Sequence, residues 1–135
     1  MSSRIDDALR LNQTALNLRA ARQELIASNI ANADTPSFKA RDIDFASALK
    51  EVMAGNAPKL AMDSTASAHL SGAGDNATVM GVPVKYRIAA QPSADGNTVD
   101  MDVERGQFAD NALRYEASVK FIGEDIKAIL SAIQG

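Results

Sequence analysis

The chain has no cysteine and no tryptophan, and only 4% of its 135 residues are aromatic. Without cysteine it can form neither a disulfide nor a thiolate metal site. Its 14 basic and 17 acidic residues give a net charge of −3, which argues against nucleic acid as a partner because phosphate binding needs a basic excess. No apolar run approaches the length of a membrane span, and the N-terminal segment lacks the apolar core of a secretory signal. We therefore expect one domain, residues 1–135, that is cytoplasmic or exported without a cleaved signal peptide.

Residues 4–31 have the apolar period of a long helix. At 100° per residue, their apolar side chains fall in a sector about 200° wide, which is well beyond the stripe of an ordinary surface helix. Within it, two sets of apolar residues repeat every seven positions: Leu11, Leu18 and Leu25, and Leu9, Leu16 and Ile30. Gln23 interrupts the second set. One neighbouring helix cannot cover both sets, so we expect this helix to pack on more than one partner.

A second long helix is predicted near the C-terminus, where apolar residues follow one another at alternating steps of four and three. These residues are Phe108, Ala112, Tyr115, Val119, Ile122, Ile126, Ile129 and Ile133. The pattern is that of a heptad seam, so we predict a mainly α fold with the two terminal helices packed as a coiled-coil-like pair. Such a seam usually forms the core of a helical hairpin, but the excess apolar width of the first helix favours contacts with other molecules as well.

We expect the assembly interface to consist of apolar residues from both terminal helices. They are Leu9, Leu16, Leu18, Leu25, Ile30, Val119, Ile122, Ile126, Ile129 and Ile133.

The middle of the chain divides into three parts. Residues 42–54 predict a short third helix that is capped by Asp42. The N-terminal part of the domain, residues 1–54, therefore consists of the long helix, a bend and this short helix. Residues 55–81 are rich in Gly, Ala, Ser and Asn and hold no period, so we expect a flexible loop. Residues 82–104 alternate apolar and polar side chains around an Asp-Gly turn, which predicts a small β-hairpin before the C-terminal helix at 105–135.

No pattern in the sequence predicts catalysis or ligand binding. His69 is the only histidine and lies in a stretch of small residues, so we expect a solvated side chain. Acidic pairs occur at Asp42 and Asp44 and within residues 100–104, and a solvated surface explains them better than a cation site. Glycine-rich phosphate loops and the nucleophile elbow of hydrolases are missing from the sequence. We therefore expect no enzyme activity, cofactor, metal or small-molecule substrate.

The first helix runs into a group of turn-forming residues. Asn29 and Asn32 can bond nearby backbone and tolerate the left-handed region, so we expect them to unwind the helix end. Pro36 disfavours helical geometry at Thr35, and Phe38 follows as an apolar anchor. These residues predict a bend that folds the short helix back against the long one.

The stretch NIANADTPSF at residues 29–38 resembles the N-terminal signature of flagellar rod, hook and hook-associated axial proteins, which reads close to N-x-A-N-x-x-T-P-G-(Y/F). KARDIDF at 39–45 and DGNTVDMDVER at 95–105, followed by NALRY at 111–115, are similar to the proximal-rod subgroup. Ser37 stands where the family pattern has glycine. A type II turn would place a positive φ there, so the turn is either type I or strained by about 1 kcal/mol or more.

The resemblance implies a non-enzymatic structural subunit of the bacterial flagellar basal body, exported without a cleaved signal peptide through the type III apparatus into the periplasm. Copies would stack helically into a hollow drive-shaft near the inner-membrane ring and export gate. The implied partners are other copies, other rod proteins, and proteins of the ring and gate. The alternatives are another rod subunit of the same family, a soluble helical adaptor or export chaperone, and, more weakly, a cell-wall hydrolase.

Overall fold

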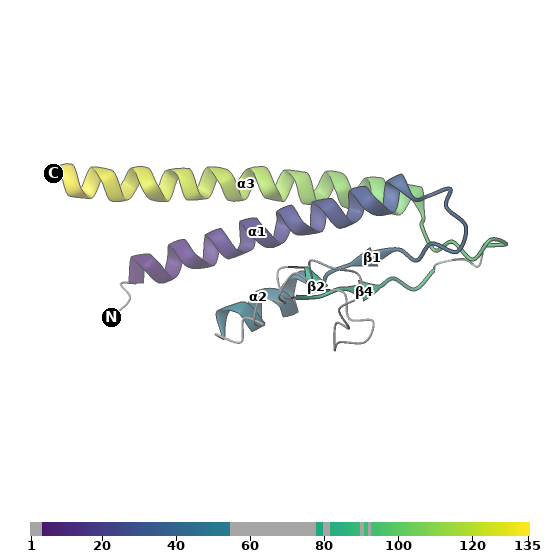
Figure 1. Cartoon of the computed structure of the whole chain (residues 1–135). Helices are drawn as coiled ribbons and strands as arrows, with labels where there is room; N and C mark the ends of the chain where they lie inside the picture. Colours follow the sequence, from purple (N-terminus) through teal and green to yellow (C-terminus); the bar gives the residue numbers. More distant parts are fainter. Residues whose placement is uncertain (1–3, 55–77, 80–81, 90, 92) are drawn as a thin grey trace, which may run out of the picture.

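The computed structural model describes residues 4–54, 78–79, 82–89, 91 and 93–135. Two long helices dominate it, α1 (Arg4–Ala31) and α3 (Met101–Gln134). They lie side by side and antiparallel, and α3 runs on past the start of α1 (Figure 1). The prediction of a mainly α fold with packed terminal helices is confirmed. Among the described residues, neither long helix contains an apolar stretch that could cross a bilayer.

A small antiparallel strand pair is present as expected, but the second strand of the predicted β-hairpin over residues 82–104 is wrong, because α3 already begins at Met101. Asp100 caps this helix by accepting hydrogen bonds from the backbone N–H groups of Asp102 and Val103, at 3.0 and 3.2 Å. Acidic side chains in a first helical turn are favoured by the helix dipole, and Asp102 and Glu104 occupy this turn. The short alternation in the sequence is therefore the start of a helix and not a strand.

The strands are only two residues long and pair differently from the prediction. β1 (Arg41–Asp42) pairs antiparallel with β4 (Lys85–Tyr86), and β2 (Thr78–Val79) pairs antiparallel with β3 (Val82–Pro83). The first pair joins segments that are far apart in the sequence, and the backbone N–H of Arg87 extends it with a 2.8 Å bond to the carbonyl of Ala40. The pairing of β1 with β4 thus holds residues 85–87 against the segment that follows the bend after α1.

The short third helix is present as α2 (Phe45–Met53). Its cap is Asp44 and not the predicted Asp42, because the Asp44 carboxylate accepts bonds from the N–H and the hydroxyl of Ser47. Asp42 lies in β1 and binds arginine side chains instead. The predicted loop at residues 55–81 lies almost entirely outside the described residues, and β2 is the part that is described.

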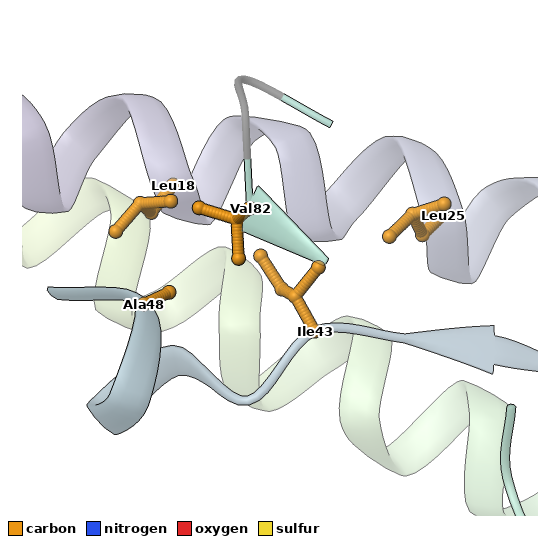
Figure 2. Close-up of a cluster of buried hydrophobic side chains, with 5 residues drawn as sticks. All are labelled: Leu18, Leu25, Ile43, Ala48 and Val82. Carbon is orange, nitrogen blue, oxygen red and sulfur yellow. The ribbon is translucent and has the colours of Figure 1, made fainter. Parts of the chain in front are cut away.

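A cluster of buried apolar side chains lies between α1 and the short elements. Figure 2 shows its buried members, which are Leu18, Leu25, Ile43, Ala48 and Val82. The elements on this side of α1 are those of residues 41–54 and 82–89. Helix α3 lies on the other side of α1 (Figure 1). The expectation that the first helix packs on more than one partner is therefore met within a single chain.

Candidate assembly surface and the elbow that orients it

The chain leaves α1 and enters α3 through two short segments, residues 32–40 and 93–99, which we call the elbow. Asn97 lies at its centre and is 7% exposed. Its Nδ2 donates to the carbonyl oxygens of Asn32, Ala33 and Thr35 at 3.0, 2.9 and 2.8 Å, and its Oδ1 accepts from the N–H of Val99 at 2.8 Å. These carbonyls belong to the turn that directly follows α1, so Asn97 ties this turn to the segment before α3.

Ser37 adopts a positive φ of 61°. The N–H of Phe38 donates to the carbonyl of Thr35 at 3.3 Å, so residues 35–38 form a turn with Ser37 at its third position. Of the two possibilities left open by the sequence, this geometry corresponds to the strained one, because a residue with a Cβ disfavours the left-handed region. The N–H of Ser37 also donates to the carbonyl of Asp95 at 2.9 Å, which fixes this turn against the second segment of the elbow.

The two elbow segments are joined along their length. The N–H of Thr98 donates to the carbonyl of Phe38 at 3.0 Å, and the N–H of Ala40 donates to the Thr98 hydroxyl at 2.7 Å. The ammonium of Lys39 donates to the carbonyl of Gly96 at 2.7 Å. The two sequence motifs that carry the family resemblance, residues 29–38 and 95–105, are therefore in direct contact.

Asn29 does not unwind the end of α1, as the sequence had suggested, but lies inside the helix and is fully buried. Its side chain forms a reciprocal pair with the backbone of Arg41: Nδ2 donates to the carbonyl at 2.8 Å, and Oδ1 accepts from the N–H at 3.0 Å. Nδ2 also lies 3.3 Å from Oε2 of Glu104. Asn32 bonds local backbone as predicted, since its Nδ2 donates to the carbonyl of Ser28 at 2.8 Å.

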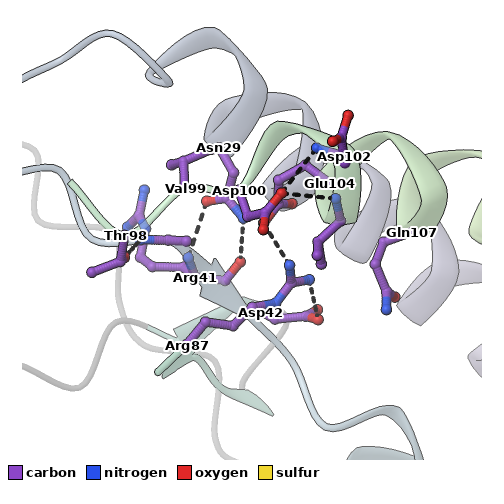
Figure 3. A network of polar contacts seen from close by, with 12 residues as sticks. Asn29, Arg41, Asp42, Arg87, Thr98, Val99, Asp100, Asp102, Glu104 and Gln107 are labelled. Carbon is purple, nitrogen blue, oxygen red and sulfur yellow. Dashed lines mark hydrogen bonds and ion pairs between the residues drawn. The ribbon is translucent and has the colours of Figure 1, made fainter. Parts of the chain in front are cut away.

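A network of charged side chains joins α1, β1, the residue after β4 and α3. Figure 3 shows Asp42, Arg87 and Glu104 within it. The Asp42 carboxylate accepts two bonds from Arg22, at 2.9 and 3.0 Å, and one from Arg87 at 2.7 Å. Arg87 also pairs with Glu104, whose side chain is 1% exposed. Arg22 donates further to Gln107 at 2.6 Å. Two cations and two anions balance within the network, so it can be buried without an uncompensated charge.

The two carboxyls of this network differ in their proton affinity. Burial alone would raise the pKa of Asp42, but the hydrogen bonds from Arg22 and Arg87 outweigh it and hold the pKa below its ordinary value. Burial raises the pKa of Glu104, because the hydrogen bond from Asn29 and the charge of Arg87 offset only part of the desolvation. Asp42 is therefore the firmly ionised anchor of the network.

The predicted interface residues fall into two groups. Leu18 and Leu25 are buried in the chain's own core and cannot contact a neighbour in this conformation. The others are half-buried or exposed: Leu9, Leu16, Ile30, Ile122 and Ile129 are half-buried, and Val119, Ile126 and Ile133 are exposed. The last three residues repeat every seven positions on α3, and we call them the outer stripe. Their exposed fractions are 46%, 46% and 77%.

A shallow groove lies between the two long helices, at the end of the pair that carries the chain termini, and the predicted interface residues Leu9 and Ile129 line it. It has a volume of about 290 Å³ and is lined by Ile5, Ala8, Leu9, Asp125, Ala128 and Ile129. Three further large apolar side chains, Leu113, Phe121 and Leu130, are at least half exposed on α3. Exposed apolar side chains that lie next to one another, as in the outer stripe, are typical of an interaction site.

Sequence reasoning missed Arg22, Arg87, Glu104 and Asn97, which carry most of the contacts in the elbow and the network. The Asp-Gly turn signal marked the position of Asn97, but nothing in the sequence indicated that its amide would bind carbonyls more than 60 residues away.

The comparisons with known proteins first define a class. The sequence model of the family described as "Flagella basal body rod protein" matches residues 9–39, which comprise most of α1 and the bend. The predicted class, a structural subunit of the flagellar basal-body rod, is confirmed by this match and by full-length relatives that carry the same description.

The relatives also define the particular family. The chain is 49% identical to "Flagellar basal body rod protein FlgB" of Salmonella typhimurium, over 100% of this chain and 99% of that protein. It is 49% identical to the protein of that name from Escherichia coli K12, over 99% of this chain and 98% of that protein. The Aeromonas hydrophila protein is 40% identical, over 100% of this chain and 98% of its own length. The chain therefore belongs to the FlgB family of flagellar basal body rod proteins.

Proposed function

We propose that copies of this rod subunit pack side by side through the outer stripe of α3 and the half-buried apolar residues of α1, and so build a hollow shaft. The observation that carries this proposal is that α3 keeps Val119, Ile126 and Ile133 exposed although it packs along α1. Completing their burial would contribute about 1–2 kcal/mol for each residue. Contacts between different surfaces of successive copies generate an open helical assembly, and this is the symmetry of a rod.

The elbow supports this function because it holds the two terminal helices in one orientation. A helical assembly repeats a single contact many times, so a small change in the angle between α1 and α3 would accumulate along the shaft. The bonds from Asn97 to the end of α1 and from Arg87 to Glu104 oppose such a change. The elbow therefore acts on assembly indirectly, by orienting the surface that neighbours bind.

We further propose that the subunit lies in the periplasm, at the end of the rod nearest the inner-membrane ring and the export gate. Its neighbours there would be other rod proteins and proteins of the ring and gate, and it would arrive by type III export without cleavage. Family membership supports this placement. Chemical cross-linking of isolated basal bodies, followed by mass spectrometry, tests it: cross-links only to components of the distal rod or hook would refute it.

The test of the packing surface is Ile126→Asp, which places a charge in the outer stripe. We expect loss of swimming and of assembled rods, while the isolated chain keeps its helical circular dichroism. The matched control is Ala117→Asp, which introduces the same charge at another exposed position of α3 outside the predicted seam. Normal rods in cells with Ile126→Asp would contradict the proposal, and so would equal loss in both variants.

Sedimentation of the purified chain separates the proposed rod subunit from the adaptor alternative, because an adaptor would form a small closed oligomer and not a polymer.

A further inference from the structure

The side of α3 that faces α1 carries a polar stripe next to the apolar one. Its members are spaced seven residues apart: Glu104, Asn111, Ser118 and Asp125. Glu104 and Asn111 are the residues of α3 that are buried, at 1% and 0% exposure. Asn29 of α1 binds Glu104 at 3.3 Å, and near the other end of the pair Asn12 of α1 binds Asp125 at 2.9 Å. The outer stripe remains exposed beside these contacts.

The middle of the contact joins Gln23 of α1 to Asn111 of α3. Gln23 is the residue that interrupts the seven-residue apolar repeat of α1. Nδ2 of Asn111 donates to Oε1 of Gln23 at 2.7 Å and to the carbonyl of Arg19 at 2.8 Å. Oδ1 of Asn111 is buried and has no hydrogen-bond partner among the described residues. Because a buried polar atom without a partner costs roughly 1–3 kcal/mol, maximal stability does not explain an asparagine here.

The two helices have other ways to pair. Apolar attraction is not directional, so burial alone would not distinguish the observed alignment from one in which α3 is shifted along α1 or turned so that the outer stripe contacts α1. In coiled coils, a single buried polar residue selects one register and one partner at a cost in stability. We propose that the Gln23–Asn111 pair is such a register-setting contact, which selects the antiparallel alignment that keeps the outer stripe exposed.

A shift shows how the selection works. Moving α3 by one helical turn displaces Asn111 by about 5.4 Å along α1, which separates it from Gln23. The Asn111 amide would then lie against other side chains of α1 without its acceptor, and Glu104 would leave Asn29. Replacing both Gln23 and Asn111 with leucine removes the part of this penalty that the Asn111 amide contributes, while the contacts of Glu104 are left in place. This inference concerns the folding of one subunit and does not depend on its place in the rod.

Two measurements test the inference on the purified full chain. Thermal unfolding is recorded for wild type, Gln23→Leu and the double variant Gln23→Leu/Asn111→Leu. The distance between spin labels at Ala8→Cys and Ala128→Cys is measured in the same backgrounds by electron spin resonance. These exposed positions line one groove from opposite helices, and the labels attach nowhere else because the chain has no cysteine. Gln13→Leu is the matched control, since it makes the same substitution at an exposed position of α1.

We expect one narrow distance in the wild type and in the control. Gln23→Leu should lower the unfolding midpoint by about 4 °C or more, because Asn111 loses one of its two acceptors. The double variant should regain the wild-type midpoint or exceed it, but show a second, different distance, because a shift of one helical turn moves the label on α3 by about 5 Å along α1. A single unchanged distance in the double variant would overturn the inference. An unchanged midpoint in Gln23→Leu would do so too, as would a wild-type chain without a defined distance.

Discussion

Replacing Asn97 tests how the elbow joins the end of α1 to the start of α3. The Asn97 side chain donates its two amide hydrogens to three carbonyls, of Asn32, Ala33 and Thr35, and accepts a bond from the N–H of Val99. Asn97→Ala removes about three hydrogen bonds from a buried site, at roughly 1 kcal/mol each, so we expect a loss of about 3 kcal/mol in unfolding free energy. For a chain of this size, the melting midpoint should fall by about 10 °C.

Asn97→Asp separates the donor role of this side chain from its volume. The introduced carboxylate keeps the bond to Val99 but faces three carbonyl oxygens, so the variant should be at least as unstable as Asn97→Ala at pH 7. Because the site favours the protonated form, the carboxyl's pKa should be higher in the folded than in the unfolded state. The deficit should therefore be smallest below about pH 4 and grow as the pH rises.

The assay for both variants is thermal unfolding followed by circular dichroism at several pH values. Asn17→Asp is the matched control, since it introduces the same carboxylate at an exposed position of α1 and should stay within about 0.5 kcal/mol of the wild type. If Asn97→Asp is as stable as this control at pH 7, the elbow does not depend on amide donors and the reasoning fails.

Three further predictions concern the bend, the charged network and the middle of the chain. Ser37→Gly should raise the unfolding free energy by about 1 kcal/mol, because it relieves the positive φ of 61°; an unchanged or lower value in a denaturant titration would contradict the strain. Asp42→Asn should lower it by about 3 kcal/mol at pH 7, because Arg22 and Arg87 lose their shared carboxylate. Since the folded pKa of Asp42 is below its ordinary value, wild type should lose this contribution as the pH falls through that pKa, whereas Asp42→Asn should lack that acid-side loss. Deleting part of residues 64–76 should impair swimming less than Ile126→Asp does, and an equal defect would place the interface elsewhere.

The sequence predicted the elements that depend on long regular patterns. The periods of 3.5 to 3.6 residues in both terminal segments predicted α1 and α3, and the Thr-Pro turn predicted the bend. It failed where a short pattern fits two structures. Residues 98–104 alternate like a strand, but Asp100 at a cap position and acidic residues in the following turn suit a helix start equally well, and only the packing of Glu104 against Asn29 and Arg87 decides between them.

The contacts within the candidate site could not be predicted for a different reason. The heptad reading of α3 assumed that apolar residues face α1, yet the neighbouring stripe with Glu104 and Asn111 is the buried one. A polar residue can replace an apolar one in a seam only when its partner is present, and the partners Asn29 and Gln23 lie far away in the sequence. The break at Gln23 was visible, but its pairing with Asn111 was not.

The central claim is that the outer stripe of α3 is exposed in the free subunit and covered by neighbours in the rod. The most direct test uses Ile126→Cys, because the chain has no cysteine of its own and the introduced thiol can be followed alone by mass spectrometry of its peptide. We predict rapid reaction with a maleimide in the purified chain and strong protection in isolated basal bodies. Equal reaction rates in the two states would contradict the account.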